Sequence, residues 1–216
     1  MTITLSGPML PPKSGQAAKQ VMVLLHGYGA DGSDLIGLGG EWRDQYPDML
    51  FVAPNAPWPC ARNPAGFEWF PLSDRPVEDF RRDGADMARP VIVNFLIDLW
   101  AQTGLSARDT VLCGFSQGAM MALHTGLSLD HKVLAIIAFS GALIPPPGAW
   151  AKPPVALIHG DLDGVVPVQL SRDAEAALKA EGVDVRFHLE AGTGHGIAPD
   201  GLGFASAFLA EVAAKT

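Results

Sequence analysis

Basic clusters, cysteines and long hydrophobic runs are all scarce in this sequence. Lysine and arginine number 15 against 23 aspartates and glutamates, which gives a formal net charge of −8. No basic run extends beyond Arg81-Arg82, so a surface that follows a phosphate backbone is not expected and nucleic acid is a poor candidate partner. The longest uninterrupted apolar run, Val133–Phe139, is far shorter than the ~20 residues that cross a bilayer, so no membrane span is expected.

The scarcity of cysteine excludes further classes of protein. The 2 cysteines, Cys60 and Cys113, cannot form a disulfide framework and cannot make a zinc site by themselves. Cys113 lies in an apolar run, where a thiol usually behaves as a small buried hydrophobe. The N-terminus shows no basic segment followed by an apolar one, so it does not resemble a secretory signal. These features together predict a cytoplasmic protein.

Runs typical of buried strands are plentiful. The chain has 216 residues, of which 48% are hydrophobic, and this predicts a single mid-sized α/β domain over residues 1–216. Most of the strand-like runs are continuously hydrophobic, as in parallel strands that are covered on both faces. The runs are Val21–Leu25, Met49–Ala53, Thr110–Gly114, Val133–Phe139, Val155–His159 and Val183–Leu189.

Helical spacing separates these runs, and we expect Pro90 in the first turn of one helix. The spaced apolar residues are Ile92, Phe95, Leu96 and Leu99 in one segment and Phe204, Phe208 and Val212 in another. Repeated β-α-β order predicts a mostly parallel, twisted sheet with helices on both faces. Residues 54–82 and 141–154 read as long ordered loops over the sheet edge.

The pentapeptide Gly114-Phe115-Ser116-Gln117-Gly118 is the most informative segment. It fits the G-x-S-x-G pattern, follows a strand-like run and leads into a helix-like one. This is the context of a nucleophile elbow, in which flanking glycines allow a sharp turn and the serine hydroxyl projects above the sheet. Ser116 is therefore the predicted nucleophile.

A serine nucleophile needs a base and an acid that orients the base, and in this architecture they follow in the order acid, then histidine. His195 lies in a glycine-rich loop after the last strand-like run and is the predicted base. Asp161 and Asp163 both follow the run that ends at His159. Asp163 is the favoured acid, because Asp161 is placed for an Asx-type bond to the backbone two residues further on.

A tetrahedral intermediate also needs donors for its oxyanion, and the backbone N–H groups of Gln117 and Tyr28 are the candidates. The Tyr28 loop, 27–32, is also a literal G-x-G-x-x-G that follows a strand, as in a dinucleotide-binding fold. Such a fold needs an acidic residue at the end of the next strand, and here that strand is followed by Pro54-Asn55. An oxidoreductase is accordingly disfavoured, and no cofactor is expected.

Metal chemistry and the remaining histidines have plainer interpretations. The segment that begins at Asp161 resembles the start of a calcium loop, but Val165 and Val166 occupy the fifth and sixth positions, so no metal is expected. His26 and His159 each end a strand-like run immediately before a glycine. We expect both to hold loops through hydrogen bonds.

The segments LLHGYGADGSD, APNAP, GFSQG, HGDLDGVVP and GTGHGI, in this order, resemble the phospholipase/carboxylesterase family of α/β-hydrolases. That family includes acyl-protein thioesterases and small bacterial carboxylesterases. The resemblance implies a compact hydrolase with no large lid domain and no cofactor, and it makes a homodimer plausible. It assigns Ser116, Asp163 and His195 to the triad and Tyr28 and Gln117 to the oxyanion hole. Tyr28 departs from the leucine that relatives often carry.

The segment 66–70 resembles the aromatic segment that lies near the substrate in this family. Trp69 and Phe70 are therefore candidate substrate-binding residues, with an aromatic plug that packs a long loop as the alternative. The sequence as a whole predicts a serine carboxylesterase acting on short- to medium-chain esters, or on thioesters, as small-molecule substrates. Acyl-protein thioesterase or lysophospholipase activity is the alternative. A non-catalytic binding protein and a peptidase on the same fold are the more distant readings.

Overall fold

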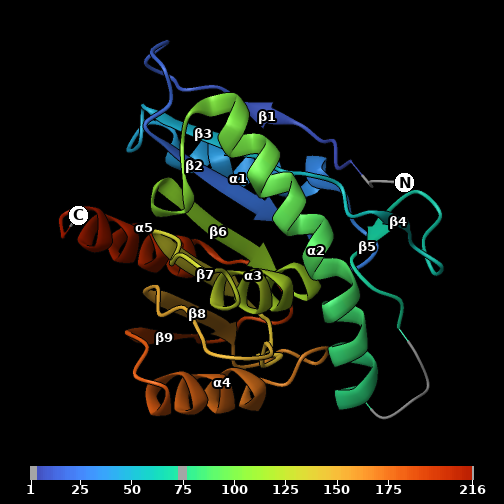
Figure 1. Ribbon diagram of the computed structural model, residues 1–216. Helices are drawn as coiled ribbons and strands as arrows, with labels where there is room; N and C mark the ends of the chain where they lie inside the picture. The colour runs from blue at the N-terminus through green and yellow to red at the C-terminus, as the bar shows by residue number, and fades with distance from the viewer. Residues whose placement is uncertain (1–3, 73–76, 216) are drawn as a thin grey trace.

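A computed structural model of the chain describes residues 4–72 and 77–215, and within them seven strands form one sheet (Figure 1). All neighbouring strands are parallel except β1, which pairs antiparallel with β3 at one edge. In spatial order they are β1 (Met9–Leu10), β3 (Met49–Val52), β2 (Gln20–Leu25), β6 (Thr110–Phe115), β7 (Ala135–Phe139), β8 (Val155–Gly160) and β9 (Val185–Glu190).

The strands form where the sequence is continuously apolar, because both faces of the sheet are covered. The central strand residues are almost wholly buried, as expected for parallel strands between helices. All six predicted runs contain a strand. Two begin later than predicted: β7 begins at Ala135, and β9 begins at Val185.

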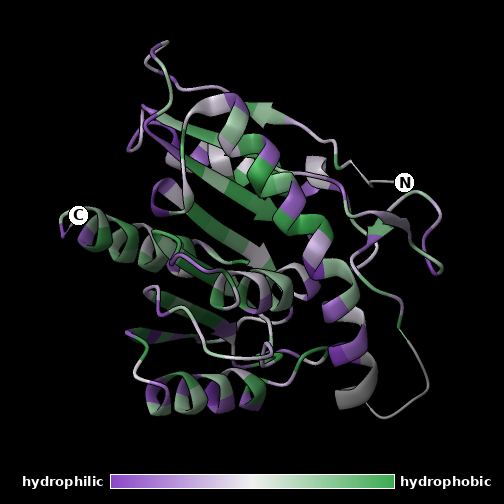
Figure 2. Cartoon of the chain, viewed as in Figure 1, coloured by the Kyte–Doolittle hydropathy of each residue, from purple (hydrophilic) through white to green (hydrophobic). Residues whose placement is uncertain are grey.

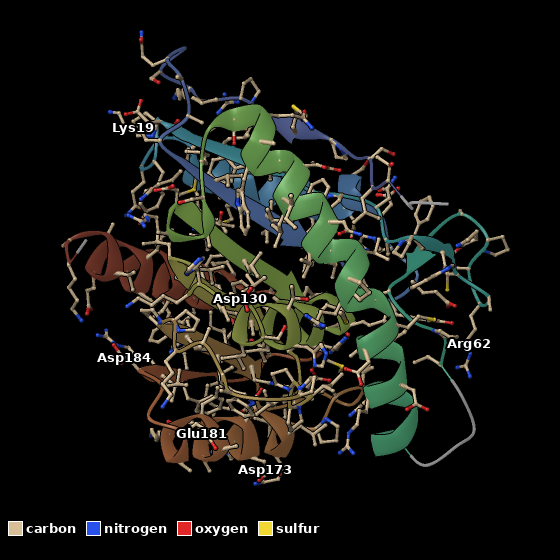
Figure 3. All side chains as sticks on the ribbon, viewed as in Figure 1. Lys19, Arg62, Asp130, Asp173, Glu181 and Asp184 are labelled. Carbon is tan, nitrogen blue, oxygen red and sulfur yellow. The ribbon has the colours of Figure 1, made fainter. Side chains whose placement is uncertain are left out.

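Helices cover the two faces of the sheet in separate groups (Figures 1 and 2). Apolar residues of α2 (Val77–Thr103), α3 (Gln117–Leu127) and α4 (Gln169–Ala180) belong to one core cluster. Those of α1 (Gly32–Trp42) and α5 (Pro199–Ala213) belong to the other. Charged side chains such as those of Asp130, Asp173 and Glu181 lie at the periphery (Figure 3). The prediction of an α/β sheet with helices on both faces is confirmed.

The prediction for Pro90 is wrong, because Pro90 lies well inside α2. The helix continues on the N-terminal side of the proline because small residues pack there. A Cβ on Gly84 would lie 2.6 Å from the Cβ of Phe70, and Ala85 and Ala88 are both fully buried. Pro90 itself is exposed. The residues on the buried face of this segment are glycine and alanine, so the sequence shows no pattern of large hydrophobic side chains there.

The predicted loop 54–82 also differs from the structure. It contains a two-stranded hairpin of β4 (Trp58–Pro59) and β5 (Phe67–Glu68), and from Val77 it is helical. Residues 73–76 of the prediction lie outside the described residues. The segment 141–154 is irregular, as predicted, and a 3₁₀ turn, Ala107–Asp109, precedes β6. In the described part of the chain, no helix combines the length and hydrophobicity that a membrane crossing requires.

The register of the sheet brings the key loops to one edge. Leu25 of β2 lies opposite Gly114 of β6, and Phe115 of β6 lies opposite Phe139 of β7. Gly160, the last residue of β8, lies opposite Glu190 of β9. The residues that follow these strands therefore meet above the carboxyl edge of the sheet, where parallel α/β folds place their sites.

Candidate active site

Ser116 lies at a sharp turn between β6 and α3. Its backbone has φ 53° and ψ −116°, a conformation that non-glycine residues rarely adopt. The flanking glycines are required by close approach: a Cβ on Gly114 would lie 2.3 Å from the Gly118 oxygen, and one on Gly118 would lie 1.9 Å from the Leu25 oxygen. The strand, the strained turn and the helix together form the predicted elbow.

His195 links Ser116 to Asp163. The Nε2 atom of His195 lies 3.0 Å from the Ser116 Oγ, and its Nδ1 atom lies 2.7 Å from Asp163 Oδ2. The carboxylate accepts the Nδ1 proton, so Nε2 is left to accept the serine hydroxyl proton. The Phe115 ring lies 4.8 Å from the imidazole, centroid to centroid, and packs against it. The structure thus brings together the three side chains that the sequence singled out.

Asp163 is held by its backbone surroundings as well as by His195. Its Oδ1 accepts hydrogen bonds of 2.8 Å from both the Val165 and the Val166 N–H groups, and its side chain is fully buried. Burial would raise the pKa of Asp163, but these hydrogen bonds and the one from His195 outweigh it and hold the pKa below its ordinary value. The carboxylate is therefore kept ionised beside the imidazole.

The predicted role of Asp161 is wrong in its detail. The Asx-type bond to a residue two positions on belongs to Asp163, through Val165. Asp161 instead accepts a 2.7 Å bond from the N–H of Gly192, across to the loop that carries His195. Its own N–H donates to the oxygen of Glu190. Asp161 therefore ties the acid loop to the histidine loop, because the β8 and β9 ends are neighbours in the sheet.

His159 and His26 hold loops, in agreement with the sequence interpretation. The Nε2 of His159 lies 2.8 Å from the Val166 oxygen and 3.2 Å from Asp163 Oδ2, both acceptors, and its Nδ1 lies 2.7 Å from Ser171 Oγ. The Nε2–H tautomer satisfies these contacts and supports the acid loop from below. His26 has the opposite tautomer, because its Nε2 accepts from the Ala56 N–H.

Gln117 and Tyr28 line the same pocket as Ser116. Gln117 is the first residue of α3, where a helix end attracts negative charge. A Cβ on Gly27 would lie 3.5 Å from the Ser116 Cβ, so the Tyr28 loop lies against the serine. Within the described residues, neither N–H donates to a backbone oxygen. Both donors are therefore available to an incoming oxyanion.

The side chain of Gln117 has a role that the sequence reasoning missed. Its Oε1 accepts a 2.9 Å bond from the Trp69 N–H, and its Nε2 donates a 2.8 Å bond to the Phe70 oxygen. The indole N–H of Trp69 donates to the His26 oxygen at 2.9 Å. Residues 69–70 thus form a clamp: they are hydrogen-bonded both to Gln117, at the start of α3, and to His26, in the segment that leads to Tyr28. The sequence feature that could have indicated this role is Gln117 itself, a polar residue at the start of a mostly apolar helix.

The prediction that Trp69 contacts substrate differs from the structure. Its side chain is fully buried and does not reach the pocket, because the indole packs beside His26 with the ring centroids 5.4 Å apart. Phe70 does line the pocket, which has a volume of about 470 Å³ and also contains Ser116 and His195. Its apolar lining consists of Phe70, Leu72, Phe115, Met120, Val165 and Val166.

No cluster of three or more His, Cys, Asp or Glu side chains within residues 4–72 and 77–215 is arranged to hold a metal ion. The site offers a serine hydroxyl, an imidazole with an ionised carboxylate behind it, and the backbone N–H groups of two residues that line an apolar pocket. This set of groups is suited to acyl transfer.

Comparison with known proteins agrees with the fold and the geometry. A family model described as Phospholipase/Carboxylesterase matches residues 12–213. Esterase YpfH of Escherichia coli is 32% identical over 182 residues, covering 83% of this chain and 77% of that protein. Acyl-protein thioesterase 1 of Neurospora crassa is 29% identical over 224 residues, covering 94% and 91%. The crystal structure of esterase PE8 superposes with a TM-score of 0.93 at 58% identity, covering 97% and 99%.

Proposed function

The chain belongs to the phospholipase/carboxylesterase family of hydrolases, and we propose that Ser116, His195 and Asp163 are the triad with which it cleaves carboxylic esters. The observation that carries this proposal is the pair of contacts at His195, 3.0 Å to Ser116 Oγ and 2.7 Å to Asp163 Oδ2. Both lie at the head of an apolar pocket.

In the proposed mechanism Ser116 Oγ attacks the acyl carbonyl while His195 Nε2 accepts its proton. The oxyanion receives hydrogen bonds from the N–H groups of Gln117 and Tyr28. His195 then gives the proton to the leaving alcohol or thiol, and the acyl group remains on Ser116. Water, activated by the same imidazole, releases the acid. Asp163 stabilises the imidazolium that forms in each half-reaction.

We propose short- to medium-chain esters as the preferred small-molecule substrates. The pocket volume of about 470 Å³ lies in the lower part of the range that small-molecule sites occupy. A series of p-nitrophenyl esters and matched thioesters with acyl chains of increasing length tests this proposal through kcat/KM. A maximum at long acyl chains, or a clear preference for thioesters, would favour the second candidate, an acyl-protein thioesterase or lysophospholipase. The name of the Neurospora crassa relative supports that candidate.

We also propose that residues 1–216 act as a single domain, in the cytoplasm, and as a homodimer. These three statements rest on the sequence reasoning. Light scattering of the purified protein measures its mass directly, and a mass near 22.8 kDa would contradict the dimer. The alternative to an esterase is a non-catalytic binding protein. A fluorophosphonate probe that leaves Ser116 unlabelled would favour this alternative.

A further inference from the structure

One cation lies in the wall of the pocket that contains Ser116. Arg81, near the beginning of α2, lines this pocket and also a second one of about 330 Å³. The second pocket is lined by residues 142–145, by Arg82 and by residues of α4, among them Asp173. Arg81 therefore borders both spaces.

Arg81 has no counterion among the residues that the structure describes. It forms no ion pair and no hydrogen bond with any residue of the described chain, although it is half-buried. Two arginines elsewhere in the chain are engaged: Arg186 pairs with Glu211 at 2.7 Å, and Arg172 lies over the Phe187 ring. Burial lowers the pKa of the Arg81 guanidinium, but the group stays charged at any physiological pH. A partly desolvated cation without a partner is unfavourable unless a ligand supplies the anion.

The residues around Arg81 indicate the chemical character of such a ligand. The pocket surface between Arg81 and Ser116 is mostly apolar, with Phe70, Leu72 and Met120 among its lining residues. The acidic residue in the same lining, Asp34, belongs to α1 on the other face of the sheet. An anionic group is thus favoured beside Arg81 in the pocket that contains Ser116, and it is disfavoured near Asp34 and near Asp173 of the second pocket.

We propose that Arg81 is a specificity residue that binds an anionic group, a carboxylate or a phosphate, carried by the ester substrate at a distance from the reacting carbonyl. The proposal rests on the proposed esterase function. The substrate class is then an ester in which a short apolar segment separates the scissile bond from the anion, such as a half-ester of a dicarboxylic acid or an acyl ester of a phosphorylated alcohol. The planar guanidinium forms paired hydrogen bonds with either anion.

The test compares charged and neutral substrates that share the same scissile ester. One pair is methyl hydrogen adipate and dimethyl adipate, with the charge on the acyl side. The other pair is the butyryl esters of glycerol 3-phosphate and of glycerol, with the charge on the alcohol side. We expect Arg81→Gln to lower kcat/KM for the anionic member of at least one pair by about 10- to 100-fold, mainly through KM. The neutral member should change by less than about threefold, and Arg81→Lys should retain part of the preference.

Arg62→Gln is the matched control, since it removes the same charge from an exposed position. Arg62 lies between β4 and β5, projects away from the molecule and lines neither pocket (Figure 3). It should leave the discrimination between charged and neutral esters unchanged. An equal loss on both members of each pair in Arg81→Gln, or no loss on either, would overturn the proposal.

Binding without turnover separates this proposal from the function on which it rests. Adipate has no ester bond, so calorimetric titration with adipate and with inorganic phosphate measures anion recognition alone. We expect at least one of these anions to bind the wild-type protein and to bind Arg81→Gln about tenfold or more weakly. Equal affinity of both proteins for both anions would contradict the role of Arg81. Failure to hydrolyse neutral esters would contradict only the esterase proposal.

Discussion

The two sides of the pocket differ in how firmly the chain holds their polar groups. On the sheet side, Asp163 makes contacts to His195, Val165 and Val166, and the Gln117 side chain makes two hydrogen bonds of its own. On the α2 side, Arg81 has no hydrogen bond or ion pair among the described residues. The groups proposed to act on every substrate are thus held in place by the protein itself, whereas the group proposed to select a substrate is left for the substrate to pair.

The largest effect is expected from substitutions of Ser116 and His195, on the side of the pocket whose polar groups are held by the protein. Ser116→Ala should leave the fold intact and lower kcat by about 10⁴- to 10⁶-fold, because no other group supplies the nucleophile. His195→Ala should cost about as much, and the double variant little more, since the two residues act as a unit. Circular dichroism confirms that the variants are folded. Additive losses in the double variant would show that His195 is not the base for Ser116.

The next largest difference is expected between substitutions of the two aspartates in the acid loop, Asp161 and Asp163. Asp163→Asn keeps an oxygen for the Val165 and Val166 N–H groups but presents an N–H to His195 Nδ1, which favours the wrong tautomer. We expect kcat to fall by about 10⁴-fold near neutral pH. Asp161→Asn is the matched control, because an amide oxygen can still accept from Gly192, and its loss should be below about tenfold. Reversed penalties in folded proteins would move the triad acid to Asp161.

The clamp behind the oxyanion donors should give a smaller effect. Trp69→Phe removes the buried donor to the His26 oxygen and should destabilise the protein by about 1–3 kcal/mol. Looser positioning of the Tyr28 loop should lower kcat by about tenfold, uniformly across acyl-chain lengths, because the side chain does not reach the pocket.

Trp150→Phe serves as the control for this clamp. It also removes an indole donor to a backbone oxygen, that of Pro146, but in a residue that does not line the pocket. Its kcat should stay within about twofold of the wild type. A loss in Trp69→Phe that varied strongly with chain length would indicate substrate contact instead.

The smallest expected effect is on stability at mildly acidic pH. Burial lowers the pKa of His26 and of His124 below the ordinary value of about 6.5. The unfolded chain therefore binds these protons first, so the stability that the neutral rings provide is complete above about pH 6.5 and is lost as the pH falls below it. The melting temperature should decrease from pH 7.5 to pH 5.

His124→Asn tests this pH dependence with little change in the fold. Its amide can still donate to the Ile144 oxygen, which the His124 Nδ1 contacts at 3.0 Å. Removing the ionisable ring should make the decrease in melting temperature between pH 7.5 and pH 5 shallower. His131→Asn, at an exposed position, should leave the slope as it is. An unchanged slope in His124→Asn would assign the effect to other groups.

The parts of the molecule that could be predicted are those encoded over short stretches of sequence. The buried strands follow from continuous apolar runs, and the elbow at Ser116 follows from glycines whose Cβ atoms would collide with neighbouring backbone. The choice of Asp163 over Asp161 follows from the family resemblance, since the Asx-type bond expected of Asp161 belongs to Asp163. These features required no knowledge of how distant segments pack.

The features that were missed depend on contacts between distant segments. Pro90 is tolerated inside α2 because Gly84 and Ala88 pack tightly before it. Such small residues do not produce the periodic hydrophobic pattern by which a helix is predicted. The contacts of Trp69 with His26 and Gln117 span more than forty positions of the chain. In the sequence Arg81 is distinguished only as part of the basic pair Arg81-Arg82, and its place in the pocket lining depends on how α2 packs.

Covalent labelling of the intact protein tests the central claim most directly. The claim is that Ser116 is activated by His195 and forms the acyl-enzyme. A fluorophosphonate probe followed by mass spectrometry should show one adduct, mapped to the peptide that contains Ser116. Ser116→Ala should show none, and His195→Ala should react more slowly by about the same factor as it loses kcat. Labelling at another residue, or an unlabelled wild-type protein that still hydrolyses esters, would contradict the account.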